Sequence, residues 1–462
     1  MFSIAAFSLE GPFFVKPVDI ALAIALSFAL LLVGVTQGAY MAYPLLGALG
    51  AFGLVARRHG TPWQSLVQSA WGGVRQSLAV IGILLLIGGL VALWMAAGTV
   101  PALVYWGLEQ VQPRTFLLWA FVLPGVISVL IGTSFGAVST IGVALMTMAS
   151  GSAINPHLIA GAIISGAYVG DRCSPLSSSA NLVAIITGTP LHDNLRAMAR
   201  TGLLPVILTG LLYGLLAIVG PPLQIDRQLQ ADIAATFSQH WSVLLPAVVV
   251  LGAALRVPVR YTLALSIGVA AAIASMVQGF SWGELLRFTW SGFYLPEAAA
   301  LAGLFQGGGV LPMIRVCGVV VVSTALAGIL TQTGLLGQVR TLTKPTSKRA
   351  QTRPKRSQQF LHTGLVGTAA ALFGCTQTIA ILLTQRLVHQ NYSHDSGADG
   401  QAAQEQALDL ENTVVVLSPL VPWNIAGLVP ATVLMSDAGF IPFAVYLYLQ
   451  PLVVLAQLKL KR

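Results

Sequence analysis

Long uncharged apolar runs alternate along the chain with short polar segments. The runs cover residues 76–108, 115–156, 201–225, 261–283, 316–339, 363–385 and 438–458. About 20 apolar residues cross a lipid bilayer as a helix, so each run is long enough for at least one crossing. The pattern predicts an all-α polytopic membrane protein, with roughly eleven to thirteen membrane segments if each takes about 20 residues.

One polar stretch, at residues 170–181, interrupts this pattern. It contains a carboxylate, a guanidinium, four hydroxyls and an amide, and apolar segments flank it on both sides. Unpaired polar groups are costly in lipid, so such a backbone is stable only where protein or water lines it. Transporters build cation and substrate sites from broken helices of this kind. The alternative is a surface loop between two spans.

A second copy of this stretch lies at residues 411–424. Both copies contain Ser-Pro-Leu, with an acid before it and an asparagine after it. A glycine-led polar break precedes each copy, at 132–136 and at 374–377. Paired interruptions in two halves are typical of transporters with internal repeats. We therefore predict an N-terminal transmembrane repeat (1–225), a polar linker (226–240) and a C-terminal transmembrane repeat (241–462).

Composition and charge agree with a protein whose main partner is the lipid bilayer. Of the 462 residues, 56% are hydrophobic and 8% are charged, whereas about a quarter of a soluble domain is charged. The net charge is +9, and a cluster of basic residues between Arg340 and Arg356 contains no acid. Such a cluster suits nucleic-acid binding or a cytoplasmic loop. The apolar spans on both sides favour the loop, so we expect no nucleic-acid partner.

Asp171 is the leading candidate for a functional carboxylate. The chain holds only 15 carboxylates, and most lie in predicted loops, including Asp409 in a polar loop at 393–409. A carboxylate in a low-dielectric site favours a proton or a bound cation, so Na⁺ and H⁺ would compete for it. The alternative role of Asp171 is a salt bridge with the adjacent Arg172.

Oxygen-bearing side chains near the two polar stretches would complete a site for an ion or a small substrate. We expect Na⁺ to be held by Asp171 together with Ser174 and Ser178. Glu411 is the equivalent acid of the second half, and its alternative is a loop position close to Asp409. The remaining candidates are Thr133, Ser134, Ser177, Asn181, Thr376, Ser418 and Asn424.

Two other classes of protein share some of these sequence features. The segment Gly132–Gly136 fits the G-x-S-x-G motif of hydrolases, but that motif needs a strand before it and a helix after it. Here the segment interrupts an apolar run, so we expect no enzyme. A membrane subunit that has lost its ion site is the other class, and it would bind neither Na⁺ nor a substrate.

The chain resembles the NhaC-type Na⁺/H⁺ antiporter family of bacterial membranes, in the ion transporter superfamily. The matching motifs are GTSFG at 132–136, STIG at 139–142, GAYVGD at 166–171, SPLS at 174–177, NL at 181–182, GGG at 307–309 and SPLVPWN at 418–424. The resemblance implies two inverted repeats with re-entrant hairpins and broken transmembrane helices. It also implies secondary transport in the bacterial inner membrane, with Na⁺ and H⁺ as coupling ions and no other cofactor. Relatives in that family also exchange organic acids or amino acids, which is the alternative function.

The chain departs from the family pattern at four positions where the family usually has acids. These positions are Ser178, Leu311, Thr331 and Asn412. Fewer titratable groups remain, so Asp171 becomes the main candidate for the proton or sodium ion. Glu411, Ser418 and Asn424 would form a mirrored half-site, and movement of one repeat against the other would give alternating access. The sequence leaves the oligomeric state open between a monomer and a homodimer.

Overall fold

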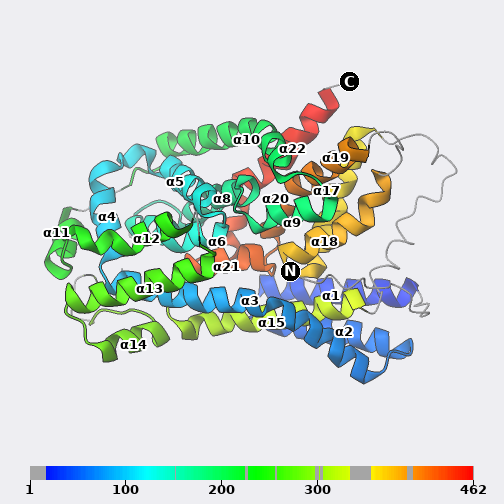
Figure 1. Cartoon of the computed structure of the whole chain (residues 1–462), viewed down its shortest axis with the longest axis horizontal. Helices are drawn as coiled ribbons and strands as arrows, with labels where there is room; N and C mark the ends of the chain where they lie inside the picture. Colours follow the sequence, from blue (N-terminus) through cyan, green and yellow to red (C-terminus); the bar gives the residue numbers. More distant parts are fainter. Residues whose placement is uncertain are drawn as a thin grey trace. The chain divides into compact units, whose positions relative to one another are not determined.

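The computed structural model describes residues 17–150, 152–223, 227–254, 257–296, 301, 305–332, 355–392 and 399–460 (Figure 1). Within these ranges the chain is helical, and no strand occurs apart from an isolated antiparallel bridge between Phe293 and Gly307. The predicted fold class, an all-α polytopic membrane protein, is confirmed. The basic residues predicted as a loop at 340–353 lie outside the described residues.

The helices follow the apolar runs in chain order. Those of the predicted first repeat are α1 (Pro17–Thr36), α2 (Ala42–Arg58), α3 (Trp63–Ala96), α4 (Thr99–Gln110), α5 (Phe116–Ile131), α6 (Ser134–Ala137), a π-helical turn (Val138–Gly142), α7 (Val143–Met148), α8 (Pro156–Cys173), α9 (Ser178–Thr187) and α10 (Leu191–Val219). The predicted linker contains α11 (Arg227–Thr236). Those of the predicted second repeat are α12 (Leu245–Ala254), α13 (Val259–Met276), α14 (Trp282–Ser291), α15 (Val310–Gln332), α17 (Arg356–Gly374), α18 (Gln377–Val388), α19 (Asp399–Asn412), α20 (Val414–Leu417), α21 (Ile425–Val433) and α22 (Val445–Leu460).

Six helices in the described ranges are long and apolar enough to cross a membrane, and two bent helix pairs raise the number to eight. Apolar stretches such as 134–148 and 445–460 form helices shorter than 18 residues and are not among these six. The number of eleven to thirteen membrane segments stays a prediction. Apolar side chains on the outside of α10, among them Leu203, Leu211 and Leu215, remain exposed, as expected for a surface that faces lipid.

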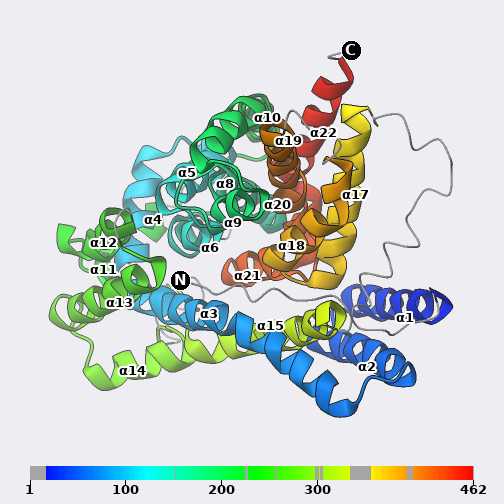
Figure 2. The ribbon, with the colours of Figure 1, turned by 45° about the vertical axis from the view of Figure 1, so that its right-hand side comes forward.

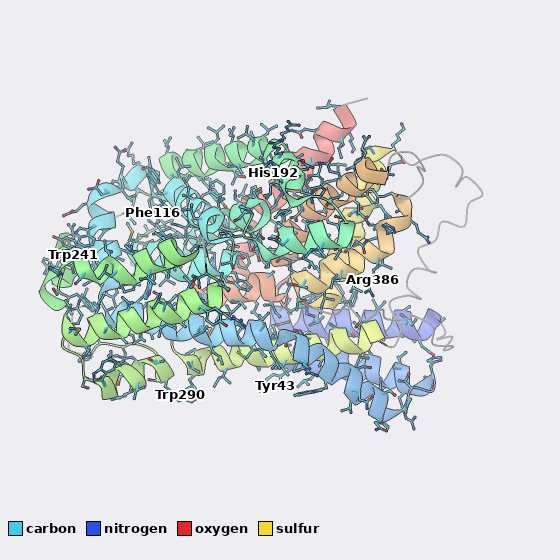
Figure 3. The ribbon with its side chains drawn as sticks, in the orientation of Figure 1. Tyr43, Phe116, His192, Trp241, Trp290 and Arg386 are labelled. Carbon is cyan, nitrogen blue, oxygen red and sulfur yellow. The ribbon has the colours of Figure 1, made fainter. Side chains whose placement is uncertain are left out.

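Two tryptophan side chains are exposed on the outside of the helices. Figure 3 places Trp241 and Trp290 on the outside of the helices, and both side chains are more than half exposed. Phe116, at the start of α5, is fully buried instead. Tryptophans are enriched at membrane–water interfaces, so the two exposed rings suit the headgroup level.

The chain forms two compact units, and each draws on separate parts of the sequence. The first comprises Met1–Leu78, Gly318–Arg353 and Phe373–Cys375, and the second comprises Ala79–Cys317, Pro354–Leu372 and Thr376–Arg462. These units are defined by packing, whereas the repeats 1–225 and 241–462 are defined by internal similarity, and the repeat boundaries stay a prediction.

Polar contacts join the helices of the first unit. His59 Nε2 lies 2.8 Å from Asp19 Oδ2, which connects the end of α2 to the start of α1. Thr324 Oγ1 donates to Ser77 Oγ at 3.1 Å, which connects α15 to α3. Hydrogen bonds between helices satisfy polar groups that would otherwise face an apolar environment.

In the second unit, α5 and α8 pack with their backbones in contact (Figure 2). Gly166 of α8 has no side chain, and a Cβ atom there would lie 2.0 Å from the carbonyl oxygen of Phe121 in α5. Close by, Ser128 Oγ donates to the carbonyl oxygen of Ala167 at 2.5 Å. Small residues allow helices in membranes to approach this closely. The contact fixes the position of α8, whose last turn carries Asp171.

Candidate functional site

The first polar stretch is a break between two helices. α8 ends at Cys173 and α9 begins at Ser178. The backbone carbonyl of Asp171, near the end of α8, accepts hydrogen bonds from Ser177 Oγ and from Ser179 Oγ, the latter at 2.8 Å. The last carbonyls of a helix have no partner within it, so these hydroxyls stabilise the end of α8 in a buried setting.

Two further side chains hold the backbone of this break in place. Ser174 Oγ donates to the carbonyl oxygen of Val129 in α5 at 2.8 Å. Asn181 Nδ2 donates to the carbonyl oxygens of Pro175 at 3.0 Å and Ser177 at 2.7 Å. The alternative of a surface loop is therefore wrong for most of the stretch, since its backbone is built into the packed helices.

The second polar stretch is also a break. α19, α20 and a 3₁₀ turn (Ser418–Leu420) lead into α21 after a bend of 53°. Ser418 Oγ donates to the carbonyl oxygen of Val414 at 2.6 Å. Asn424 caps α21 through its Oδ1 atom, and its Nδ2 atom donates to the carbonyl oxygen of Ala371 in α17 at 3.0 Å. Both Ser418 and Asn424 are fully buried.

The two glycine-led breaks share one backbone pattern. In the first, Gly132 has a φ of 77° and Thr133 is extended before α6 begins. In the second, Cys375 has a φ of 54° and Thr376 is extended before α18 begins. A positive φ is uncommon for a residue other than glycine. The backbone geometry therefore matches Gly132 with Cys375. The order of the residues alone matches Gly132 with Gly374, one residue earlier.

Both breaks lead to one carboxylate, that of Asp171, which is 5% exposed. Gln377, the first residue of α18, donates from Nε2 to Asp171 Oδ2 at 3.3 Å and to the carbonyl oxygen of Val415 at 3.0 Å. The backbone of Ser134, the first residue of α6, hydrogen-bonds the same carboxylate. Groups from both sequence halves thus meet at Asp171, near the point where α8 and α20 lie side by side (Figures 1 and 2).

Arg172 is fully buried, and its guanidinium makes its hydrogen bonds to groups other than Asp171. In the described part of the chain no ion pair joins the two residues, so the alternative of a salt bridge between them is wrong. The guanidinium instead donates to neutral acceptors on four helices, which are Cys173 Sγ at 3.1 Å, Tyr446 OH at 3.4 Å, Met198 O at 3.0 Å, Thr201 Oγ1 at 2.9 Å and Asn412 Oδ1 at 2.7 Å. Asp171 keeps its carboxylate for other partners.

Glu411 is fully buried in α19, so its alternative reading as a loop residue is wrong. Among the described residues, neither of its carboxylate oxygens has a hydrogen-bond partner. It interacts electrostatically with Arg172 and Asp171. A buried carboxylate without hydrogen bonds is costly unless a proton or a cation accompanies it. Glu411 is therefore a second acid at the site whose charge must be balanced.

Asp409 lies two residues before this acid in α19 and serves a different purpose. The sequence predicts a loop at 393–409, but α19 begins at Asp399 and Asp409 is 1% exposed. Arg356 binds its carboxylate through both terminal nitrogens, at 2.5 and 2.6 Å, and Tyr392 OH donates to it at 2.5 Å. The loop prediction is wrong for 399–409, because the carboxylate of Asp409 is paired with Arg356 and can therefore be buried. Residues 393–398 lie outside the described residues.

The predicted oxygen ligands occupy different settings. Ser134 is buried, Thr133 is partly buried and Ser178 is exposed at the start of α9. Thr376 Oγ1 caps α18 by accepting from the backbone N–H of Ile379 at 3.2 Å. The hydroxyls of Ser174, Ser177 and Ser418 donate to carbonyls, which leaves oxygen lone pairs for a cation. Coordination of Na⁺ by these residues stays a prediction.

Several residues of the site are absent from the sequence-based candidates. Gln377 and Tyr168 lie within motifs that the sequence analysis singled out, and Tyr168 OH donates to the carbonyl oxygen of Ala426 at 2.7 Å, which joins α8 to α21. Gln450 lies in the mostly apolar run 438–458, and its Nε2 donates to Asn412 Oδ1 at 2.7 Å. An amide side chain within a predicted membrane span is the sequence signal that would have identified Gln450.

Comparison with known proteins gives one family across the whole chain. The model of the Na⁺/H⁺ antiporter family matches residues 4–180 and residues 166–458. The chain is 28% identical to the malate-2H⁺/Na⁺-lactate antiporter of Bacillus subtilis over 399 residues, which cover 84% of this chain and 83% of that protein.

Two further relatives have comparable similarity. The arginine/ornithine antiporter ArcD of Halobacterium salinarum is 29% identical over 89% of this chain and 85% of its own length. The Na⁺/H⁺ antiporter NhaC of Alkalihalophilus pseudofirmus is 27% identical over 88% of this chain and 87% of its own length. The resemblance inferred from the motifs is thus confirmed.

Proposed function

The chain belongs to the Na⁺/H⁺ antiporter family, and from that membership we propose that it exchanges Na⁺ for H⁺ across a bacterial inner membrane, with Asp171 binding the two ions in turn. The observation that carries the proposal is the setting of this carboxylate. It is buried and hydrogen-bonded by the starts of α6 and α18, and in the described part of the chain it forms no ion pair with the adjacent guanidinium.

A buried carboxylate of this kind can hold either ion but not both. Protonation removes its charge, and a bound Na⁺ balances the charge instead. The N-terminal end of a helix favours negative charge, so the start of α18 at Gln377 stabilises the ionised form when the proton leaves. Competition between the two ions for one carboxylate gives exchange without a second site for the proton.

The experiment is a flux assay in proteoliposomes that contain a trapped pH-sensitive dye. An imposed Na⁺ gradient should drive proton movement in the wild-type protein, and a lower pH should raise the apparent KM for Na⁺ because protons compete for the carboxylate. Asp171→Asn should abolish the flux. Asp193→Asn, at an exposed acid in the first turn of α10, is the matched control and should transport normally. Normal flux in Asp171→Asn would remove the assigned role.

A second candidate function is Na⁺- or H⁺-coupled exchange of a small organic acid or amino acid. The similarity to a malate/lactate antiporter and to an arginine/ornithine antiporter, at identities close to that of the Na⁺/H⁺ antiporter, favours it. Uptake of labelled malate, lactate, arginine and ornithine by the same proteoliposomes, with and without Na⁺, distinguishes the two functions. Solute uptake that requires Na⁺, with no solute-free proton flux, would favour the exchanger.

A further inference from the structure

Arg172 and Glu411 form a buried pair of opposite charges without a hydrogen bond between them. Both side chains are fully buried. Among the described residues, Arg172 Nε and both carboxylate oxygens of Glu411 have no hydrogen-bond partner. The 2.7 Å hydrogen bond from Arg172 to Asn412 nevertheless holds the guanidinium against α19, next to Glu411 in sequence.

The electrostatic partners of Arg172 set Glu411 apart from Asp171. The leading ones among the described residues are Cys173 from α8, Tyr446 from α22 and Glu411 from α19. Asp171 precedes Arg172 in the chain but is not among them. Cys173 and Tyr446 are neutral at ordinary pH, so the guanidinium compensates the carboxylate of the second sequence half rather than that of its own neighbour.

We propose that Arg172 is a specificity-determining residue, whose fixed positive charge offsets Glu411 and leaves one net negative charge, so that the site binds a single monovalent cation. This inference rests on the proposed function. When both carboxylates are ionised, as at alkaline pH, two carboxylates and one guanidinium sum to one negative charge, which one Na⁺ or Li⁺ neutralises. A divalent cation would leave an excess positive charge in a buried, low-dielectric setting, and that excess is costly.

The inference predicts how each single substitution changes the ion that is bound. Arg172→Gln leaves two negative charges, which match one Ca²⁺ or two Na⁺, because Ca²⁺ is a hard cation that takes carboxylate ligands. Glu411→Gln leaves Arg172 to balance Asp171, so the site is neutral and loses cation affinity although Asp171 is intact. The double variant Arg172→Gln/Glu411→Gln has one negative charge and returns to binding one monovalent cation.

The experiment measures binding to the purified full-length protein in detergent at a fixed alkaline pH. Labelled Na⁺ gives the number of bound ions, and thermal shifts with Na⁺, Li⁺, Mg²⁺ and Ca²⁺ give the selectivity. Wild type and the exposed control Arg200→Gln should bind one Na⁺ without a Ca²⁺ shift. Arg172→Gln should gain a Ca²⁺ shift or a second Na⁺, and Glu411→Gln should weaken Na⁺ binding at least about tenfold.

The outcomes separate this inference from the proposed function. A wild-type protein that binds no Na⁺ contradicts the proposed function itself. A wild-type protein that binds one Na⁺, with Arg172→Gln showing the same ion count and no Ca²⁺ shift, overturns the inference alone. Should Arg172→Gln fail to fold, Arg172→Lys must keep monovalent selectivity, and the double variant must bind one Na⁺. Ca²⁺ binding by either of them overturns the inference.

Discussion

Gln377 Nε2 lies 3.3 Å from Asp171 Oδ2, and this hydrogen bond joins the first residue of α18 to the last turn of α8. The same nitrogen donates to the carbonyl oxygen of Val415. One amide therefore connects the second glycine-led break, the carboxylate of the first half and the second broken helix.

Gln377→Leu should raise the KM for Na⁺ roughly tenfold, because an unpaired buried polar group costs about 1–3 kcal/mol. The measurement is Na⁺-driven proton flux over a range of Na⁺ concentrations. Gln385→Leu is the control on the same helix, since the side chain of Gln385 donates to the carbonyl oxygen of Ile186, at 3.4 Å, and not to Asp171. An equal effect of the two substitutions would contradict a role specific to the site.

Gly166→Ala should destabilise the protein, because the added methyl group would lie 2.0 Å from the carbonyl oxygen of Phe121. Overpacking of this kind costs about 1–3 kcal/mol, and more where backbone must move. Thermal unfolding in detergent measures the loss. Gly214→Ala in α10, where a Cβ atom meets nothing within 4 Å, should leave the Tm unchanged or raise it. A normal Tm for Gly166→Ala would show that α5 and α8 separate at no cost.

Asp409→Asn should lower the free energy of unfolding by about 3–5 kcal/mol, because it breaks a buried ion pair and leaves Arg356 without its charged partner. Glu405→Gln is the matched control. Glu405 also contacts Arg356, at 3.3 Å, but its side chain is 22% exposed, so its loss should cost less than about 1 kcal/mol. Equal Tm values for the two variants would show that the pair with Asp409 does not stabilise α17 against α19.

The start of α14 should depend on pH through Glu284, whose pKa is lowered by hydrogen bonds from the Ser281 hydroxyl and backbone N–H, at 2.7 and 2.8 Å. A lowered pKa in the folded state means that the stabilisation is complete above the ordinary pKa and is lost as pH falls through the lowered one. Protection of the first amides of α14 against hydrogen exchange should hold from pH 7 to about 5 and then decrease. Ser281→Ala should remove this pH dependence, and an unchanged profile in that variant would contradict the assignment.

The local order of polar residues predicted the breaks but not the direction of their side chains. Ser-Pro-Leu and the glycine-led segments mark backbone that leaves the helix, and that property is local. Arg172 follows Asp171 directly, yet all its acceptors except Cys173 come from α10, α19 and α22, which only the packing brings together. Asp409 reads as a loop acid by composition, and its burial depends on Arg356, 53 residues earlier. Charge pairs between distant helices have no local signature.

The backbone contact between α5 and α8 limits how the carboxylate can change sides. Because the backbones of α5 and α8 are in contact, neither helix has room to slide or roll on the other. We therefore expect the two helices to move as one rigid body. The distance between one spin label on α5 and another on α8 should stay the same in every step of the transport cycle. We therefore expect the movement that turns Asp171 from one aqueous compartment to the other to occur outside the contact between α5 and α8.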